Sequence, residues 1–324
     1  MIHFLLDAAQ GGIDRYLVLA CLVCSFIVTI VLLKVLQTQL PVDGGRKFAV
    51  NGALSQGKPR GAGIIFVLVH ILVVVLFLPM DKELIIYMIM LLAAMLSGYL
   101  DDAAKTPWGE YKKGIIDFVI AIVCAVTYVN FNSSEFVIAI SGATIKLHPV
   151  LFVILAVILI WASINVVNCT DGVDGLSGTL SLVTLISFYI VFNNICHNTL
   201  YCTVILSFVL CIIGYLWYNA SPSKLLMGDA GSRAIGLFIA LLALKSGRPL
   251  LFLPLAFVFI VDGGLGLIKV ALLRFLKIHI LKNTRTPLHD HVRKNIGWSD
   301  TQTVFRFTII AVVICMIYLY AVLL

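Results

Sequence analysis

The sequence predicts an all-α, polytopic membrane protein with about ten transmembrane helices. Its 324 residues are 61% hydrophobic and only 12% charged, and the mean hydropathy is +1.08. Soluble domains are nearer half apolar and a quarter charged, so this composition excludes a soluble globular protein. The apolar runs are continuous rather than alternating, which favours helices over a membrane β-barrel.

Ten apolar runs account for the predicted spans, since a helix needs about 20 residues to cross the hydrocarbon core. In chain order they are 17–40, 61–79, 83–100, 114–130, 149–167, 177–193, 200–217, 233–246, 249–273 and 303–323. Glycine and proline gather mostly between them, where helices end. No internal repeat interrupts the series, so we expect one domain over residues 1–324. We expect no cleaved signal peptide, because a basic region and a cleavage site are missing before the first span.

Lysine and arginine are distributed unequally between the two sets of connections. The first set comprises 41–60, 101–113, 168–176, 218–233 and 269–306, and it holds 17 of the 23 basic residues. The opposite set holds five, and one lies within the first span. Because cytoplasmic loops carry the excess, we expect the first set in the cytoplasm and both termini outside. The net charge of +7 is thus mostly a topology signal, and no nucleic-acid-binding motif accompanies it.

The connections on the expected cytoplasmic side are rich in Asp, Gly, Asn and His. They contain SQGKPRGAG (55–63), LDDAAK (100–105), NCTDGVDG (168–175), WYNASPSKLLMGDAGS (217–232) and TPLHDHVRK (286–294). Taken alone, each stretch could be a solvated turn or a helix cap. Five such stretches on one side predict a single reaction site at the cytoplasmic surface of the membrane.

Five carboxylates lie in the second, third and fourth of these stretches. Asp101 and Asp102 end one span, and Asp171 and Asp174 are three residues apart. Asp229 stands near the start of a later span. Acids gathered at one surface repel each other and therefore require cations. Mg²⁺ prefers oxygen ligands and often combines one or two carboxylates with substrate phosphates.

Positive charge and glycine accompany these acids. The basic residues are Lys58, Arg60, Lys105, Lys112, Lys113, Lys224 and Arg293, and the glycines are Gly172, Gly175, Gly228 and Gly231. Basic side chains bind anions, and glycine lets a ligand approach the main chain closely. Acids for a metal ion, bases for anions and glycine for close approach together indicate phosphoryl-transfer chemistry.

Two further carboxylates lie within or beside apolar runs. Asp117 falls in GIIDFVIAIV and Asp262 in FIVDGGLGLIKV. A carboxylate in a span is costly and is usually functional or paired, and the sequence leaves both roles open. The Gly-Gly pair after Asp262 predicts a kink in the ninth span.

The motifs LDDAAK, NCTDGVDGLSG, WYNASPSKLLMGDAGS and TPLHDHVRKNIGWSDTQTVFRF resemble, in order, those of the polyprenyl-phosphate N-acetylhexosamine-1-phosphate transferase superfamily. The resemblance is strongest to its phospho-N-acetylmuramoyl-pentapeptide transferases and covers residues 55–307. It implies transfer of the phospho-sugar peptide from UDP-N-acetylmuramoyl-pentapeptide to undecaprenyl phosphate, giving lipid I and UMP for peptidoglycan synthesis. It also implies Mg²⁺ as cofactor and the bacterial cell membrane as location, with membrane lipid as a partner. A homodimer is a further expectation.

The residues and the resemblance together assign roles to thirteen positions. The expected catalytic residues are Asp101, Asp102 and His289; the expected metal ligands are Asp229, Asn168 and Asp171; the expected substrate-binding residues are Lys58, Lys105, Gly172, Asp174, Asn219, His291 and Arg293. Asp174 and its neighbours match the side of the family's site that receives uridine.

Several positions depart from the family pattern. Asp290 replaces the middle His of PLHHH, Leu226 stands where Phe is common, and Asp262 replaces Glu. The stretch GKPRGAGI is looser than the family's TPTMGG, and there Lys58 and Arg60 could supply polar contacts. Position 290 therefore cannot be a strictly required imidazole, and aromatic stacking of uracil at Leu226 is in doubt.

Three alternatives stay open. A sister enzyme that transfers N-acetylglucosamine-1-phosphate for teichoic acid or surface polysaccharide would share the carboxylates, although TPLHDH, GWSD and VFRF favour the muramoyl branch. A transporter or lipid flippase would place ionisable residues near the bilayer midplane, often within inverted repeats, and neither feature is visible. For the transferase, direct in-line attack assisted by Asp101 or Asp102 and a covalent aspartyl intermediate both fit the sequence.

Overall fold

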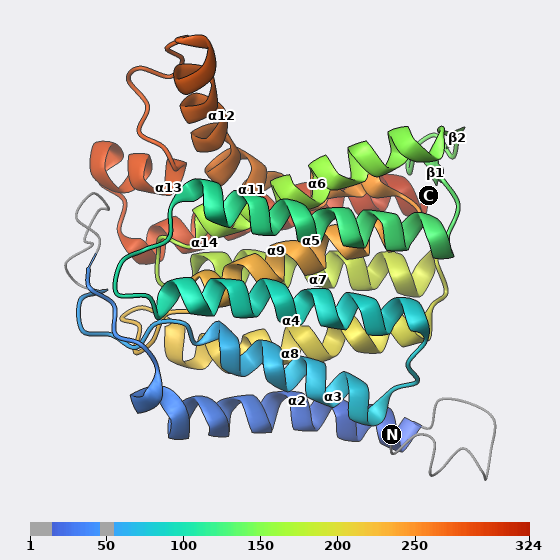
Figure 1. Cartoon of the computed structure of the whole chain (residues 1–324), viewed down its shortest axis with the longest axis horizontal. Helices are drawn as coiled ribbons and strands as arrows, with labels where there is room; N and C mark the ends of the chain where they lie inside the picture. Colours follow the sequence, from blue (N-terminus) through green and yellow to red (C-terminus); the bar gives the residue numbers. More distant parts are fainter. Residues whose placement is uncertain (1–14, 46–54) are drawn as a thin grey trace.

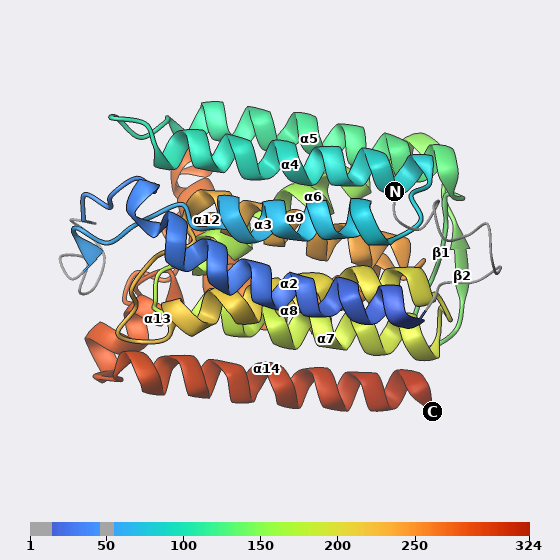
Figure 2. The ribbon, with the colours of Figure 1, turned by 90° about the horizontal axis from the view of Figure 1, so that it is seen from below.

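The structure is a computed structural model in which residues 15–45 and 55–324 are described. Long helices run side by side along one axis and form a bundle (Figures 1 and 2). Residues 1–14 and 46–54 lie outside the described part. Two expectations concern these residues, namely that the N-terminus faces outward and that there is no cleaved signal peptide. Two of the basic residues counted for the orientation also lie there.

The ten predicted spans all fall on helices or on a series of short helices. The long ones are α2 (Arg15–Leu36), α3 (Gly63–Phe77), α4 (Lys82–Asp102), α5 (Glu110–Phe131), α6 (Pro149–Thr170), α7 (Leu176–Asn194), α8 (Thr199–Asn219), α9 (Gly228–Lys245) and α14 (Asp300–Leu323). The short elements are η1 (Gln37–Gln39), η3 (Pro249–Leu251), α10 (Phe252–Leu255), α11 (Phe257–Phe259), η4 (Ile260–Gly264), α12 (Leu265–Ala271), η5 (Leu272–Leu276), α13 (Leu288–His291) and η6 (Val292–Ile296).

The polytopic helical fold is confirmed, although fewer than ten helices qualify as spans. Among the described residues, seven helices are long and apolar enough to cross a membrane, and a bent pair makes an eighth if its halves form one span. The predicted spans that fall short are α3, which has only 15 residues, and α9, whose first turns carry Asp229 and Arg233.

The ninth predicted span bends at a different place from the one expected. Its halves, Pro249–Leu255 and Phe257–Leu276, meet at 72°, so the break lies at Ala256 rather than at the Gly-Gly pair. At Ala256 the main chain leaves the helical conformation, with φ −107° and ψ 19°. The glycines lie instead in the π-helix η4, where a Cβ at Gly263 would collide with the main chain of Val166 on α6.

A small hairpin that was not predicted lies at the end of the bundle where α14 finishes (Figure 1). Strands β1 (Glu135–Val137) and β2 (Thr144–Lys146) pair antiparallel, with Glu135 opposite Lys146. Three-residue strands are too short to produce a recognisable alternating pattern, so hydropathy does not reveal them.

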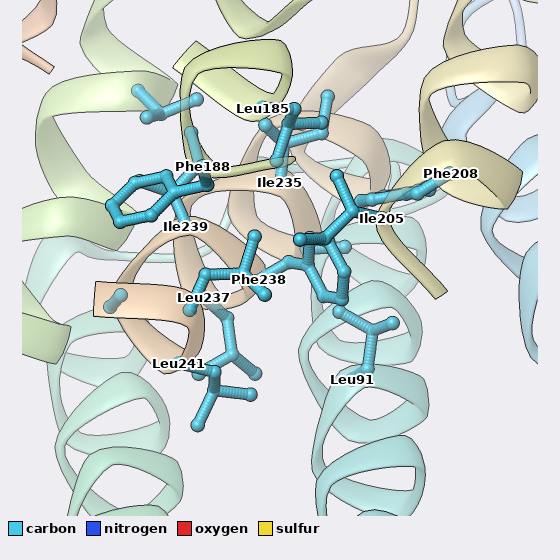
Figure 3. Packing of buried hydrophobic residues seen from close by; sticks show 14 of the residues in the cluster. Leu91, Leu185, Phe188, Ile205, Phe208, Ile235, Leu237, Phe238, Ile239 and Leu241 are labelled. Atoms are coloured by element: carbon cyan, nitrogen blue, oxygen red, sulfur yellow. The ribbon is translucent and has the colours of Figure 1, made fainter. Parts of the chain in front are cut away.

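Helix α9 lies at the centre of the bundle, with the apolar side chains of its neighbours around it (Figure 3). Every residue from Gly228 to Leu244 is buried, and α4 and α6 make the most extensive contacts with it. The Phe238 ring meets the edge of the Phe208 ring with centroids 4.9 Å apart. This packing fixes the start of α9 beside the ends of α4 and α6.

The polar connections predicted to lie on one side do meet at one end of the bundle. Helices α4, α6 and α8 end there and α5, α7, α9 and α14 begin there, at the left in Figures 1 and 2. The C-terminus lies at the opposite end. Side chains far apart in the sequence are thereby brought into contact.

Candidate active site

Arg60 links three carboxylates from separate segments. Its Nε lies 2.8 Å from Asp102 Oδ1 at the end of α4, and its Nη2 donates to Asp229 Oδ1 on α9 at 3.3 Å. Its Nη1 donates to Asp43 Oδ1 at 3.4 Å. Burial alone would lower the pKa of Arg60, but these carboxylates, Asp102 first, hold it above its ordinary value. The guanidinium is therefore a permanent positive charge in the site.

Asp102 also fixes the start of α9. Its Oδ1 accepts from the Asp229 main-chain N–H at 3.2 Å, and its Oδ2 accepts from that of Ala230 at 3.1 Å. A carboxylate at a helix N-terminus pairs with N–H groups that lack an intrahelical partner. Gly98 makes this possible, because a Cβ there would collide with the Asp229 carbonyl. The acid at 102 thus positions the helix that carries Asp229.

Asp101 forms an ion pair with a second cation of the site. Its Oδ2 pairs with Lys113 on α5, whose Nζ also lies 3.1 Å from Asp229 Oδ2. The Asp101 Oδ1 accepts from the Trp108 main-chain N–H at 2.6 Å, which closes the loop between α4 and α5. Lys112 lies over the Trp108 ring, 3.3 Å from its centroid. Asp229 is therefore held by a cation on each carboxylate oxygen.

The connection from α6 to α7 contributes an amide and a carboxylate next to the same helix. Asn168 Nδ2 donates to Ser232 Oγ at 3.0 Å, one turn after Asp229, and the Ser232 hydroxyl donates to the Gly228 carbonyl. Asp171 follows α6 directly and is partly exposed. Its charge acts on Arg60. These three expected metal ligands therefore lie around the start of α9.

A second group of polar contacts joins residues 55–63 to the loop after α8. Asp174 Oδ2 accepts from the Ser223 main-chain N–H at 2.9 Å and pairs with Lys58 Nζ at 3.4 Å. Lys58 also donates to Ser223 Oγ at 2.9 Å. Asn219 Oδ1 accepts from the Gly175 N–H at 2.8 Å, which ties α8 to the start of α7. Asp174, expected on the uridine side, is thus joined to Lys58 and Ser223, and Asn219 holds its neighbour Gly175.

His289 is held between the bent ninth segment and the α6–α7 connection. Its Nδ1 lies 2.8 Å from Asp262 Oδ2, and its main-chain N–H donates to Asp262 Oδ1 at 2.7 Å. A Cβ at Gly172 would collide with Nε2 of the ring. Asp262, whose role the sequence left open, is thus the residue that orients His289.

Three expected residues lie outside these contacts. Arg293 is buried and pairs with Asp290 at 3.4 Å and with Asp300 at 2.7 Å. His291 Nδ1 accepts from the main-chain N–H of Arg285 at 3.2 Å, and Lys105 is exposed on the loop after α4. Arg293 therefore braces the segment that carries His289, while roles for His291 and Lys105 toward substrate stay predictions.

The donor set around α9 suits a hard divalent ion. Two cations, Arg60 and Lys113, contact four carboxylates, those of Asp43, Asp101, Asp102 and Asp229. Within these contacts, the negative charges therefore exceed the positive charges by two. No three His, Cys, Asp or Glu side chains in the described part are placed to hold one ion. Asp229, Asp171 and the Asn168 amide match an ion that takes few protein ligands and completes its shell with phosphate and water.

Asp117, the other acid in an apolar run, is paired inside the bundle. Its Oδ2 accepts from Arg233 Nη2 at 2.7 Å, and both side chains are almost fully buried. Arg233 also donates to Ser97 Oγ and to the Lys113 carbonyl. This pair ties α4, α5 and α9 together below the site and is structural.

Comparisons with known proteins agree with these observations. Residues 84–247 match the family described as glycosyl transferase family 4. A phospho-N-acetylmuramoyl-pentapeptide-transferase of Treponema pallidum (strain Nichols) is 44% identical over 292 residues, which are 84% of this chain and 80% of the relative. The protein of that name from Dictyoglomus turgidum is 31% identical over 78% of this chain and 80% of its own. The one from the Wolbachia of Drosophila simulans is 29% identical over 79% and 81%.

Proposed function

The chain belongs to glycosyl transferase family 4, and we propose that it transfers phospho-N-acetylmuramoyl-pentapeptide from UDP-N-acetylmuramoyl-pentapeptide to undecaprenyl phosphate. The products are lipid I and UMP, and the reaction is a membrane step of peptidoglycan synthesis. The observation that carries this proposal is the 44% identity to the Treponema pallidum transferase over 84% of the chain. The cluster of acids and cations at one end of an apolar bundle supports it, since two phosphates and a lipid must meet there.

The proposed location is a bacterial cell membrane, with the site end in the cytoplasm and both termini outside. The excess of lysine and arginine in the connections at that end supports this orientation. Undecaprenyl phosphate would then enter from the bilayer with its phosphate at the depth of the charged cluster. We further expect a homodimer, which light scattering of the detergent-solubilised chain would test.

Mg²⁺ is the proposed cofactor, held by Asp229, Asp171 and the Asn168 amide oxygen. When bound, it supplies positive charge to the diphosphate and to the leaving UMP. The chain adds fixed positive charge of its own through Arg60 and Lys113, both within ion-pair distance of Asp229. These groups lower the repulsion between two anionic substrates, which is the main electrostatic barrier to their reaction.

Direct attack of the lipid phosphate on the β-phosphate is the proposed route. A phosphate monoester has a second pKa near 6, so it is largely dianionic at pH 7 and needs little help from a base. All four oxygens of Asp101 and Asp102 already contact donors or cations. This supports a positioning role for the pair rather than attack by a carboxylate. Isolation of a labelled covalent adduct from the wild-type protein would overturn the direct route.

His289 is proposed to contact the diphosphate through Nε2. A carboxylate only accepts hydrogen bonds, so the proton of the neutral ring is on Nδ1, toward Asp262. Nε2 faces Gly172 and lies 3.9 Å from Asp290 Oδ1. The carboxylate at 290 replaces the imidazole of the family motif and anchors Arg293, so it stabilises the segment instead of binding substrate.

UMP release by the detergent-purified full chain tests this proposal against the sister reaction. Undecaprenyl phosphate and Mg²⁺ are supplied with either UDP-N-acetylmuramoyl-pentapeptide or UDP-N-acetylglucosamine. We expect release with the muramoyl donor alone and none from the Asp229→Asn variant. Release with the acetylglucosamine donor would move the protein to the sister pathway, and release with neither from a folded sample would contradict the transferase function.

A further inference from the structure

Arg60 is not among the thirteen residues expected to be catalytic, metal-binding or substrate-binding. Its guanidinium contacts one acid expected to assist the reaction, Asp102, and the expected metal ligand, Asp229. A third contact reaches Asp43, which precedes the segment outside the described residues. The Arg60 side chain is 23% exposed, so one side of it stays open to substrate.

The main chain places this side chain before any substrate binds. The Arg60 N–H donates to the Pro41 carbonyl at 2.7 Å. On its other side, the Pro59 carbonyl accepts from Leu226 at 2.8 Å, and the Leu226 carbonyl accepts from Ala62 at 3.0 Å. Residues 59–62 are thus registered against the segment that leads directly into Asp229, so the distance from Arg60 to α9 is set by main-chain bonds.

The contact geometry requires a planar fork. Nε, Nη1 and Nη2 each contact a different carboxylate, and these carboxylates belong to three segments. A lysine ammonium is a point charge that can retain the charge but cannot make three divergent contacts at once. Substitutions of Arg60 can therefore test the contribution of its charge separately from that of its planar shape.

The same contacts set up a competition at Asp229. Arg60 Nη2 lies 3.3 Å from Asp229 Oδ1, so a divalent ion bound to that carboxylate would lie near a fixed positive charge. Like charges so close repel strongly where solvent is partly excluded. Without substrate, the guanidinium is one of two counter-ions of Asp229, the other being Lys113, and its charge opposes binding of a free metal ion at this carboxylate.

We propose that Arg60 is a positioning residue that holds Asp102 and Asp229 together and acts, beside Lys113, as a resident counter-ion with which a divalent ion competes. The proposal rests on the function proposed above and deepens it. It explains how the site keeps its acids in place without substrate, and it makes tight metal binding depend on the phosphates that the substrate brings.

Two variants and a distant control test this on the full chain in detergent. Arg60→Met removes charge and fork, Arg60→Lys retains only the charge, and Lys146→Met removes a charge from the exposed hairpin pair at the other end. Mn²⁺ binding without substrate is measured from the electron spin resonance of the free ion. The turnover number kcat and the thermal unfolding of each variant are measured in parallel.

We expect Arg60→Met to bind Mn²⁺ several-fold more tightly than wild type while its kcat falls at least tenfold. Arg60→Lys should keep the wild-type Mn²⁺ affinity within about twofold and still lose turnover, and Lys146→Met should match wild type in both. Simple structural damage would instead weaken metal binding and turnover together, and that result in Arg60→Met would overturn the proposal.

Other results are equally decisive. Unchanged turnover in both Arg60 variants would refute the positioning role. If neither the wild type nor any variant bound Mn²⁺, the counter-ion role would be refuted. Mn²⁺ affinities that follow the expected order in a chain that transfers no substrate would leave the Arg60 inference standing and refute the proposed function.

Discussion

Asp262 and His289 are joined by two contacts although 26 residues lie between them in the sequence. The His289 main-chain N–H donates to Asp262 Oδ1 at 2.7 Å, and the ring Nδ1 lies 2.8 Å from Oδ2. Asp262 lies in the π-helix η4 of the bent ninth segment and is fully buried. These two contacts therefore hold the imidazole of His289 against Gly172 in the α6–α7 connection.

Asp262→Asn should slow transfer without unfolding the protein. The amide keeps the size of the side chain but loses the anion that holds the proton on Nδ1, and losing such a supporting partner typically costs about 10- to 100-fold. Steady-state kcat measures this, with Asp262→Glu as the control that retains a carboxylate. If Asp262 acts through His289, adding Asp262→Asn to His289→Ala should cause no further loss; fully additive losses would contradict that link.

Gly172→Ala should disable the site while the fold survives. The added methyl group would occupy the place of His289 Nε2, so the ring must move, and a displacement of about 1 Å can cost about 100-fold in rate. Gly114→Ala is the matched control, because a Cβ there meets nothing within 4 Å. Equal activity of the two variants would show that the position of His289 does not matter.

Lys58→Met should affect binding of the UDP donor more than turnover. Lys58 contacts Asp174 and Ser223 in the network expected to receive uridine, and losing a hydrogen bond to a charged group costs about 1.5–3 kcal/mol, or roughly tenfold or more in KM. The KM of the donor and that of the lipid are measured separately. A rise confined to the KM of the lipid would show that Lys58 contributes to binding of the lipid and not to binding of the UDP donor.

Asp117→Ala should destabilise the bundle severely. It would leave Arg233 charged and buried without its partner, and breaking a buried pair on one side typically costs about 3–5 kcal/mol. The free energy of unfolding, measured by titration with a denaturing detergent, checks this. Replacing both partners, as Asp117→Asn with Arg233→Met, should recover part of the loss. Glu135→Ala, which opens the exposed Lys146 pair, should cost about 1 kcal/mol or less.

Hydropathy predicts the helices of this protein well and their exact limits less well. Every predicted span lies on a helix or, for the ninth, on a series of short helices, because a continuous apolar run needs a structure that satisfies its own main chain in lipid. The bend was misplaced because Gly263 and Gly264 are used for close packing against α6, whereas the main chain leaves the helical conformation at Ala256. Neither role can be distinguished by residue type alone.

The residues of the candidate site could be predicted from the sequence, but the contacts between them could not. The acids and His289 were found because they are chemically unusual for a membrane protein. That Arg60 would reach Asp229, 169 positions away, or that Lys113 would bridge two acids, depends on packing around α9. Both cations were visible in the sequence, but a positive charge in these loops is also the ordinary signature of orientation.

The most direct test of the proposed function is the mass of the lipid product. Purified full chain is incubated with undecaprenyl phosphate, Mg²⁺ and UDP-N-acetylmuramoyl-pentapeptide, and the extracted lipid is analysed by mass spectrometry. The proposal predicts a lipid heavier by one phospho-N-acetylmuramoyl-pentapeptide, formed in step with UMP and absent with the Asp229→Asn variant. An unmodified lipid from folded wild-type protein, or a product formed only from UDP-N-acetylglucosamine, would contradict it.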